Sequence, residues 1–186
     1  MNCFIKSLII VLNFLVFSIY SQEVPPINVF SPEDYAAENQ NWAITQAPNK
    51  YIYVANNKGL LEYNGTSWRL YPTPNETILR SVKSFQDKIY CGFYRDFGFW
   101  KKNNLGVLEY TSIVEEKKLK MLEDEQIWEI LELDNFMIFK SLQRIYLYDL
   151  KSESIKIIKT SKNIIKIADS TPCFSSIKNE DKYLEE

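Results

Sequence analysis

Hydrophobic and polar positions alternate along the chain in short runs that are separated by turn residues. The stretch "YIYVANNKGLLEYNGTSWRLYP" (residues 51–72) contains three such runs, and "NWAITQ" (residues 41–46) stands before it as a fourth. Each run has the length of a strand and is rich in Ile, Val, Tyr or Trp, which favours antiparallel strands joined by tight turns. The Asn64-Gly65 pair predicts a two-residue hairpin turn, because a type I′ turn needs positive φ at both central positions.

The same series of four runs recurs twice further along the chain. The second copy reads "LRSVKSF", "KIYCGFY", "FGFWKK" and "GVLEYTS", and the third reads "IWEILEL", "FMIFKS", "RIYLYDL" and "SIKIIK". In the first run of each copy, equivalent positions are Ile44, Val82 and Ile130, at intervals of 38 and 48 residues. Another copy begins near Ile177, which follows Ile130 by 47 residues.

Units of four antiparallel strands at a spacing of 40 to 50 residues are typical of β-propeller blades. We therefore predict an all-β fold, an incomplete β-propeller built of four-stranded antiparallel blades. The expected blades are residues 39–72, 77–112 and 126–159, with a partial blade at 163–186. A β-sandwich is the alternative, but its strands would not need repeats in matched register. Since closed propellers have about four to eight blades, we expect the chain to be the front part of a longer protein.

Two features inside the repeat carry further expectations. The charged insertion "VEEKKLKMLEDEQ" (residues 114–126) is compatible with a turn or two of helix or with a solvated loop, and its "EDE" is expected to be a solvated acidic turn. All four tryptophans stand at strand positions, so we expect them to pack in the core rather than to stack on a ligand. They are Trp42, Trp68, Trp100 and Trp128.

The first residues have the order of a secretory signal. Lys6 precedes an apolar run at residues 7–20, and "SQE" follows it, so we expect a signal peptide at residues 1–21 and a mature propeller region at 22–186. An uncleaved membrane anchor is the alternative, but the run is shorter than the ~20 residues that a spanning helix needs. The expected location is therefore outside the cytoplasm.

Charge and cysteine content exclude several classes of function. The chain has 22 basic and 24 acidic side chains, and its net charge of −2 becomes −3 when Lys6 is removed. This balance gives no electrostatic reason to expect contact with nucleic acid. Cys91 and Cys173 remain after the leader, which also carries Cys3, and we interpret both as small buried apolar residues rather than as a disulfide framework.

With the repeat established, the wording of the blades resembles a known family. The stretches "NQNWAITQ", "YIYVANNKGLLEYNGTSWRLYPTPNETILRSV", "DKIYCGFYRDFGFWKKNNLGVLEYTSI", "LEDEQIWEI" and "FKSLQRIYLYDL" resemble bacterial two-component-regulator propeller proteins over residues 30–160. The resemblance implies a periplasmic ectodomain of blades, followed by a triple-tyrosine domain, a membrane helix and a cytoplasmic output domain. It is strongest to the branch with a LuxR-type helix-turn-helix output, whereas other branches carry a histidine kinase.

The sequence offers little catalytic chemistry. It contains no histidine, which excludes Ser-His-Asp and Cys-His nucleophile systems and ordinary zinc sites. None of its five glycines belongs to a phosphate-binding G-x-G-x-x-G motif. We therefore expect no enzyme activity, catalytic residue, metal or cofactor. A pair of carboxylates from different blades that acts on a polysaccharide is the alternative from another class.

The links between the second and third strands of each blade carry the candidate binding residues. They are "ANNKG" (55–59), "FYRDFG" (93–98) and "KSLQR" (140–144), and equivalent links of a propeller emerge on one face near the channel. We expect them to converge on a polar ligand, with Tyr94 as a stacking face for a sugar ring. The alternative is that they hold turns and pair with each other. The candidate residues are Asn56, Asn57, Tyr94, Arg95, Asp96 and Gln143.

The resemblance completes the functional expectation. It implies a periplasmic sensing region of a regulator anchored in the inner membrane, which binds a small molecule or glycan fragment and does not itself contact nucleic acid. Its expected partners are the further blades and output domains of the same protein, with a homodimer of the full-length protein as one possible assembly. A purely structural interaction platform is the remaining alternative.

Overall fold

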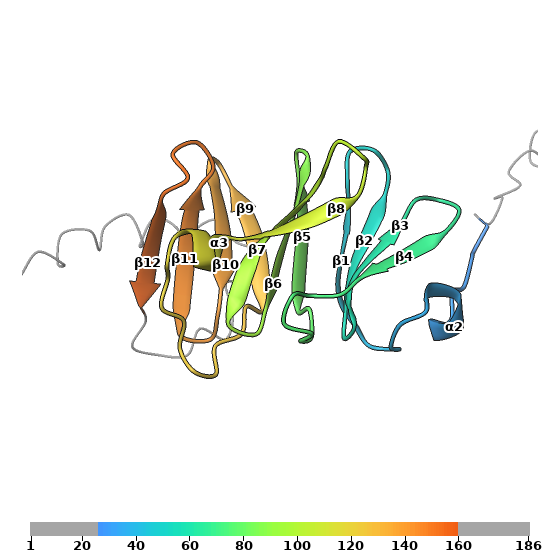
Figure 1. Ribbon diagram of the computed structural model, residues 1–186, viewed down its shortest axis with the longest axis horizontal. Helices are drawn as coiled ribbons and strands as arrows, with labels where there is room; N and C mark the ends of the chain where they lie inside the picture. The colour runs from blue at the N-terminus through green and yellow to red at the C-terminus, as the bar shows by residue number, and fades with distance from the viewer. Residues whose placement is uncertain (1–25, 160–186) are drawn as a thin grey trace, which may run out of the picture. The chain divides into compact units, whose positions relative to one another are not determined.

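The computed structural model describes residues 26–159, so the expected signal peptide, the partial fourth blade and Cys173 lie outside the described residues. Residues 31–159 belong to one compact unit. It contains three four-stranded antiparallel sheets, in each of which the strands pair in chain order (Figure 1). The prediction of an all-β fold built of four-stranded blades is confirmed.

The strands have the following bounds. Sheet 1 consists of β1 (Asn41–Gln46), β2 (Ile52–Asn56), β3 (Gly59–Tyr63) and β4 (Trp68–Tyr71). Sheet 2 consists of β5 (Ser81–Phe85), β6 (Lys88–Phe93), β7 (Asp96–Lys102) and β8 (Leu108–Ser112). Sheet 3 consists of β9 (Glu129–Leu133), β10 (Phe136–Lys140), β11 (Arg144–Asp149) and β12 (Ile155–Lys159). Two single-turn helices accompany them, α2 (Pro32–Tyr35) and α3 (Ile113–Glu116).

The first strands of the three sheets lie next to one another, with β5 between β1 and β9. Side-chain hydrogen bonds join them. The backbone N–H of Ser84 donates to Thr45 Oγ1 at 3.1 Å, and Ser81 Oγ donates to the carbonyl of Ile127 at 3.1 Å. The sheets therefore meet along their inner strands, as the blades of a propeller do.

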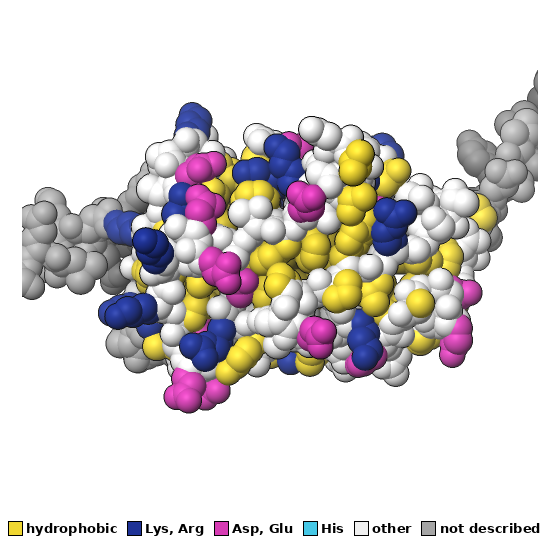
Figure 2. Space-filling model, viewed as in Figure 1, with side chains coloured by type: hydrophobic (Ala, Val, Ile, Leu, Met, Phe, Trp, Pro, Cys, Tyr) yellow, Lys and Arg dark blue, Asp and Glu magenta, His cyan; other side chains and the backbone are white. Residues whose placement is uncertain are grey.

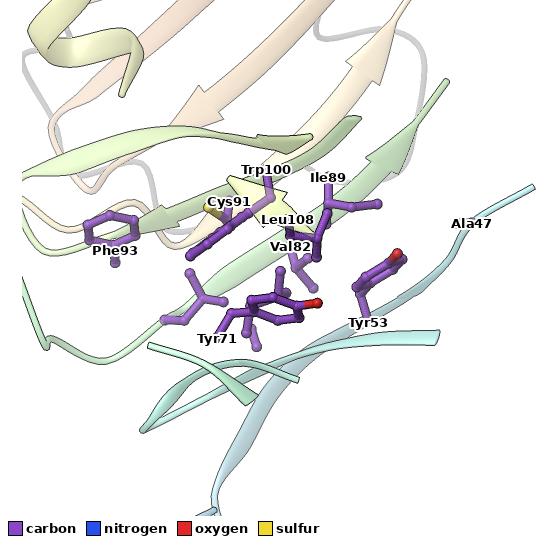
Figure 3. Close-up of a cluster of buried hydrophobic side chains, with 12 residues drawn as sticks. Ala47, Tyr53, Tyr71, Val82, Ile89, Cys91, Phe93, Trp100 and Leu108 are labelled. Carbon is purple, nitrogen blue, oxygen red and sulfur yellow. The ribbon is translucent and has the colours of Figure 1, made fainter. Parts of the chain in front are cut away.

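Two apolar layers fill the spaces between sheets. Between sheets 1 and 2, Tyr53 and Tyr71 face Ile89, Cys91 and Trp100 (Figure 3). Between sheets 2 and 3, an aromatic group is centred on Phe97, whose ring centroid lies 4.4 Å from that of Phe139 and 4.9 Å from that of Tyr146. Such tilted ring pairs are favourable beyond the area that they bury, and they explain the aromatic content of the chain.

Alternation along β2 places its side chains on opposite faces, as period-two geometry requires. Tyr53 and Ala55 face sheet 2, whereas Val54 packs with Leu61 on the other face. Tyr35 of α2 belongs to the same group, and its ring meets Trp68 edge-on with centroids 5.7 Å apart. Helix α2 therefore covers the face of sheet 1 that points away from sheet 2.

Gly92 of β6 lies directly against Ile127 of blade 3. A Cβ atom at this position would collide with Cβ and Cγ2 of Ile127. Ile127 is fully buried at the start of blade 3. Glycine is therefore required at Gly92 by the neighbouring blade and not by a turn.

The turn after β3 differs from the prediction. Asn64–Ser67 is a four-residue loop and not a two-residue turn, since β3 ends at Tyr63 and β4 begins at Trp68. Gly65 has φ 95°, but Asn64 is not among the residues with positive φ. The side chain of Asn64 explains the geometry, because its Oδ1 accepts from the backbone N–H groups of Thr66 and Ser67.

Candidate functional site

The three links that carry the predicted binding residues lie along one edge of the described unit. The β2–β3, β6–β7 and β10–β11 connections all stand at the lower edge in Figure 1. This common placement follows from the topology, since each blade runs through its strands in the same order. Whether each candidate residue faces a ligand depends on its own hydrogen bonds.

Asn56 is buried and holds the backbone of sheet 1. Its Nδ2 donates to the carbonyl of Glu38 at 2.6 Å and to Asn41 Oδ1 at 2.8 Å, while its Oδ1 accepts from the backbone N–H of Lys58 at 2.9 Å. These bonds occupy the amide group within the blade. Asn56 thus acts as the turn-holding residue that was the alternative in the sequence.

The β6–β7 link is tied to the insertion that precedes blade 3. Tyr94 Oη donates to the carbonyl of Glu123 at 2.8 Å, and the N–H of Arg95 donates to the carbonyl of Glu125 at 2.8 Å. Arg95 is exposed and has φ 56°. None of the ion pairs among the described residues joins Arg95 to Asp96.

Asp96 points into its own blade. Its carboxylate accepts from Tyr110 Oη at 3.1 Å and from Ser112 Oγ at 2.7 Å. Burial raises the pKa of the Asp96 carboxyl above its ordinary value, against the lowering effect of these hydrogen bonds. Asp96 therefore stabilises the β7–β8 pair from a partly desolvated position.

The two remaining candidates, Asn57 and Gln143, stand beside tryptophans of the inner strands. Asn57 Oδ1 accepts from the indole Nε1 of Trp42 at 2.8 Å. Gln143 is exposed and lines a small recess, of about 40 Å³, together with Gln126 and Trp128. The structure thus places these two of the six predicted residues next to one aromatic group that the sequence reasoning did not select.

That group consists of Trp42, Arg80 and Trp128, here called the Trp–Arg–Trp cluster. The guanidinium carbon of Arg80 lies 3.9 Å from the ring centroid of Trp42 and 4.9 Å from that of Trp128. The two indoles meet edge to face, with centroids 6.3 Å apart. Each residue comes from a different blade, so the cluster joins all three described sheets at their inner strands.

The expectation that all four tryptophans pack in the core is correct only in part. Trp100 is buried, and Trp68 is partly buried in the apolar group under α2. Trp42 and Trp128 are each 39% exposed. The indoles of the Trp–Arg–Trp cluster therefore offer ring surface to the solvent.

Arg80 is a cation with few partners. Its Nε donates to Gln126 Oε1 at 3.0 Å, but its Nη1 is buried without a hydrogen-bond partner. No carboxylate of the described residues forms an ion pair with it. Burial alone lowers the pKa of the guanidinium, because desolvation disfavours the charged form.

The repeat contained a signal for this cluster. Trp42, Arg80 and Trp128 stand two positions before Ile44, Val82 and Ile130, the equivalent residues of the first runs. The backbone confirms that Arg80 and Trp128 are equivalent, since their N–H groups donate to Gly92 and Lys140, which occupy matching positions in β6 and β10. A search for polar or aromatic residues at one repeat position would have selected these three residues as candidates, without showing that they meet.

The acidic turn of the insertion is also different from the expectation. Glu123 and Asp124 are exposed, but Glu125 is buried. Its carboxylate accepts from Ser141 Oγ at 2.7 Å and from Tyr146 Oη at 2.9 Å, and Arg144 Nη1 lies 3.8 Å away. The prediction of a wholly solvated turn was therefore wrong, because Glu125 fastens the insertion to blade 3. Of the one or two helical turns that the sequence allowed for this insertion, the structure forms the single turn of α3.

Two surveys of the described residues bear on function. Within residues 26–159, no group of three His, Cys, Asp or Glu side chains is arranged to hold a metal ion. No helix in that range has the length and apolar character needed to cross a membrane. On the face shown in Figure 2, basic and acidic side chains are interspersed.

Comparison with known proteins identifies the fold. No family model and no curated protein matches the chain. Among solved structures, it is similar to the extracellular domain of BT4673 from B. thetaiotaomicron, described as a one-component system, with a TM-score of 0.50 and 17% identity over 64% of this chain. A second structure of the extracellular domain of that protein, described there as a hybrid two-component system, has a TM-score of 0.49, 17% identity and 66% coverage of this chain. Each match spans only 16% of the other chain.

Proposed function

We propose that the chain is part of a ligand-sensing propeller region, which lies outside the cytoplasm and belongs to a larger regulator. The observation that carries the proposal is the Trp–Arg–Trp cluster, in which three blades bring an unpaired cation and two exposed indoles together. The likeness of fold to an extracellular domain of a signalling protein supports the location and the role.

The proposed role is binding without chemistry on the ligand. Two observations support it: the whole sequence lacks histidine, and the described part of the chain holds no cluster of three potential metal ligands. Aromatic and amide side chains gathered beside converging strands suit recognition, since they fix a ligand by stacking and hydrogen bonds. Gln143, beside Trp128, is proposed as a polar contact of this site, and Asn57, whose amide group is hydrogen-bonded to Trp42 and Glu38, as the residue that orients Trp42.

The proposed mechanism depends on the contact between blades. A ligand that engages residues from three sheets favours one arrangement of those sheets over others, and it can shift an equilibrium only by its difference in affinity for the two arrangements. Further blades and a membrane-linked output domain of the same protein would carry this bias to the cytoplasm. The resemblance to two-component-regulator propeller proteins suggests a LuxR-type output and leaves a homodimer of the full-length protein as its proposed assembly.

A thermal-shift screen against oligosaccharide fragments tests the proposal. A ligand present at 100 times its dissociation constant stabilises the folded state by about 2.7 kcal/mol, which raises the melting temperature of a domain of this size by roughly 5–11 °C. We expect at least one fragment to do so without the appearance of new reducing ends. Release of reducing ends would favour a polysaccharide-acting enzyme instead, and a panel without any stabilising fragment would favour a structural platform.

A further inference from the structure

We propose that the Trp–Arg–Trp cluster is the subsite for an oxyanion carried on a sugar ring, either a carboxylate or a sulfate ester. The inference rests on the proposed function and makes its ligand class specific. Its basis is the buried, unbonded guanidinium nitrogen of Arg80, which sets this residue apart from the other partly exposed cations of the described chain.

Most of those other cations have a carboxylate partner, whereas Lys83 and Lys88 form no ion pair with the described residues but have no buried nitrogen without a hydrogen-bond partner. Lys102 Nζ lies 3.2 Å from Glu62, Lys140 Nζ lies 2.6 Å from Glu129, and Arg144 Nη1 lies 3.8 Å from Glu125. Arg80 has no such partner among the described residues, although burial already disfavours its charge. A partly buried charge is costly unless it is paired. Among the described residues, Arg80 is the one cation with a buried nitrogen that lacks a hydrogen-bond partner, and a ligand anion would supply that partner.

Hydrogen bonds to neighbouring amide groups also fix the positions of Arg80 and Trp42. Gln126 Oε1 accepts from Arg80 Nε at 3.0 Å, and Asn57 Oδ1 accepts from Trp42 Nε1 at 2.8 Å. Asn57 is fixed in turn, because its Nδ2 donates to Glu38 Oε2 at 2.7 Å. Groups that are ordered before binding lose less conformational freedom when the ligand arrives, so the affinity is higher.

The indoles indicate what carries the anion. Trp42 and Trp128 are each 39% exposed, and the guanidinium lies against their rings. Exposed indole surface suits the apolar C–H face of a sugar ring. The guanidinium donors suit the two oxygens of a carboxylate or the terminal oxygens of a sulfate ester. A neutral sugar could use the indoles but would leave Arg80 without a counter-charge. The cluster therefore favours acidic or sulfated sugars over neutral ones.

The test uses three monosaccharide probes of one ring type, which are glucuronate, glucose 6-sulfate and glucose. Binding to the full mature chain is measured by calorimetry and by the fluorescence of its tryptophans at millimolar probe. We expect at least one charged probe to bind at least about tenfold more tightly than glucose, since a charge-assisted hydrogen bond is lost with the neutral sugar. The two charged probes distinguish a carboxylate from a sulfate ligand.

Variants assign the preference to Arg80. Arg80→Gln should abolish the discrimination between charged and neutral probes. Arg80→Lys, which keeps the charge but loses the planar fork, should reduce it in part. The matched control is Arg69→Gln, which removes the same charge from the exposed Arg69 of β4 and should leave all three affinities unchanged.

Several results would overturn the inference. If Arg80→Gln and Arg80→Lys both discriminate as the wild type does, the anion binds elsewhere. If glucose binds as tightly as the charged probes, the oxyanion has no role, but sugar sensing would stand. If no probe binds, the assignment of the cluster also fails, whereas the proposed function is decided separately by the oligosaccharide screen.

Discussion

The indole rings of Trp42 and Trp128 meet edge to face at a centroid distance of 6.3 Å and an interplanar angle of 74°, although they stand 86 positions apart in the sequence. Trp42 belongs to β1, and Trp128 immediately precedes β9, so the contact joins the first and third sheets across the second. Arg80, which immediately precedes β5, completes the contact from the middle sheet. Inner strands that converge in this way are what a common axis of the blades requires.

This contact predicts energetic coupling between blades 1 and 3. Trp42→Ala and Trp128→Ala should be non-additive by about 0.5–1.5 kcal/mol, because either change removes the same ring pair and disturbs the shared Arg80. Urea unfolding of the wild type, both single variants and the double variant measures the coupling. Trp68→Ala combined with Trp128→Ala is the control pair, for which additivity within about 0.5 kcal/mol is expected. Additive effects of Trp42→Ala and Trp128→Ala on the free energy of unfolding would contradict energetic coupling between blades 1 and 3.

The buried contacts of Glu125 predict that its substitution strongly destabilises the fold, although the residue lies in a charged loop. Glu125→Ala should lower the free energy of unfolding by about 3–5 kcal/mol, because it leaves the poorly exposed Arg144 without its carboxylate. The hydroxyls of Ser141 and Tyr146 lose their acceptor in the same change. Chemical denaturation gives the difference, and Glu123→Ala at an exposed neighbouring position should change it by less than about 0.5 kcal/mol. Similar values for the two variants would mean that Glu125 is solvated, as the sequence suggested.

The raised pKa of Asp96 predicts that the contribution of this residue to stability falls as the pH rises. Its pKa is raised in the folded chain because burial disfavours the carboxylate. The folded state therefore binds more protons than the unfolded state between the two pKa values. The contribution of Asp96 is fully present below the unfolded pKa, about 3.9, and is lost as the pH rises through the folded pKa. Asp96→Asn should remove this dependence, so the difference from the wild type should change across that window.

Asp87 provides the control of opposite sign. Lys101 Nζ lies 2.8 Å from its carboxylate, and this hydrogen bond lowers the pKa of Asp87. The stabilisation by Asp87 is thus present above the unfolded pKa and is lost as the pH falls through the folded one. Both side chains are more than half exposed, so the effect should be at most about 1 kcal/mol. Denaturation curves at a series of pH values from 3 to 7 distinguish the two residues; parallel profiles for Asp96→Asn and Asp87→Asn would refute the assignment.

The burial of Cys91 predicts that its thiol is unreactive in the folded chain. It is a free cysteine, fully buried in the layer between sheets 1 and 2, and burial raises the pKa of its thiol. Because the thiolate is the reactive form, Cys91 should react with a disulfide reagent only after unfolding. The measurement uses a chain in which Cys3 and Cys173 are replaced by Ser, with urea-unfolded protein as the reference. Rapid labelling of the folded chain would show that the layer opens under native conditions.

Local patterns predicted the architecture because a blade is built from short-range features. Period-two alternation and turn residues recur in the same order in each copy, so the four strands and their order could be found without coordinates. The same alternation accounts for the placement of Val54 and Tyr53 on opposite faces of β2. The Asn64-Gly65 turn was wrong in detail because the side chain of Asn64 binds the following N–H groups and stabilises a longer loop.

The sequence by itself determined the repeat and its strand content, since these depend on neighbours along the chain. Only the tertiary structure decided which equivalent positions meet. Trp42, Arg80 and Trp128 come together because three inner strands converge, and Glu125 becomes buried because its loop folds back onto Ser141 and Tyr146. Such contacts depend on the packing angle between sheets, which leaves no trace in the alternation of any single strand.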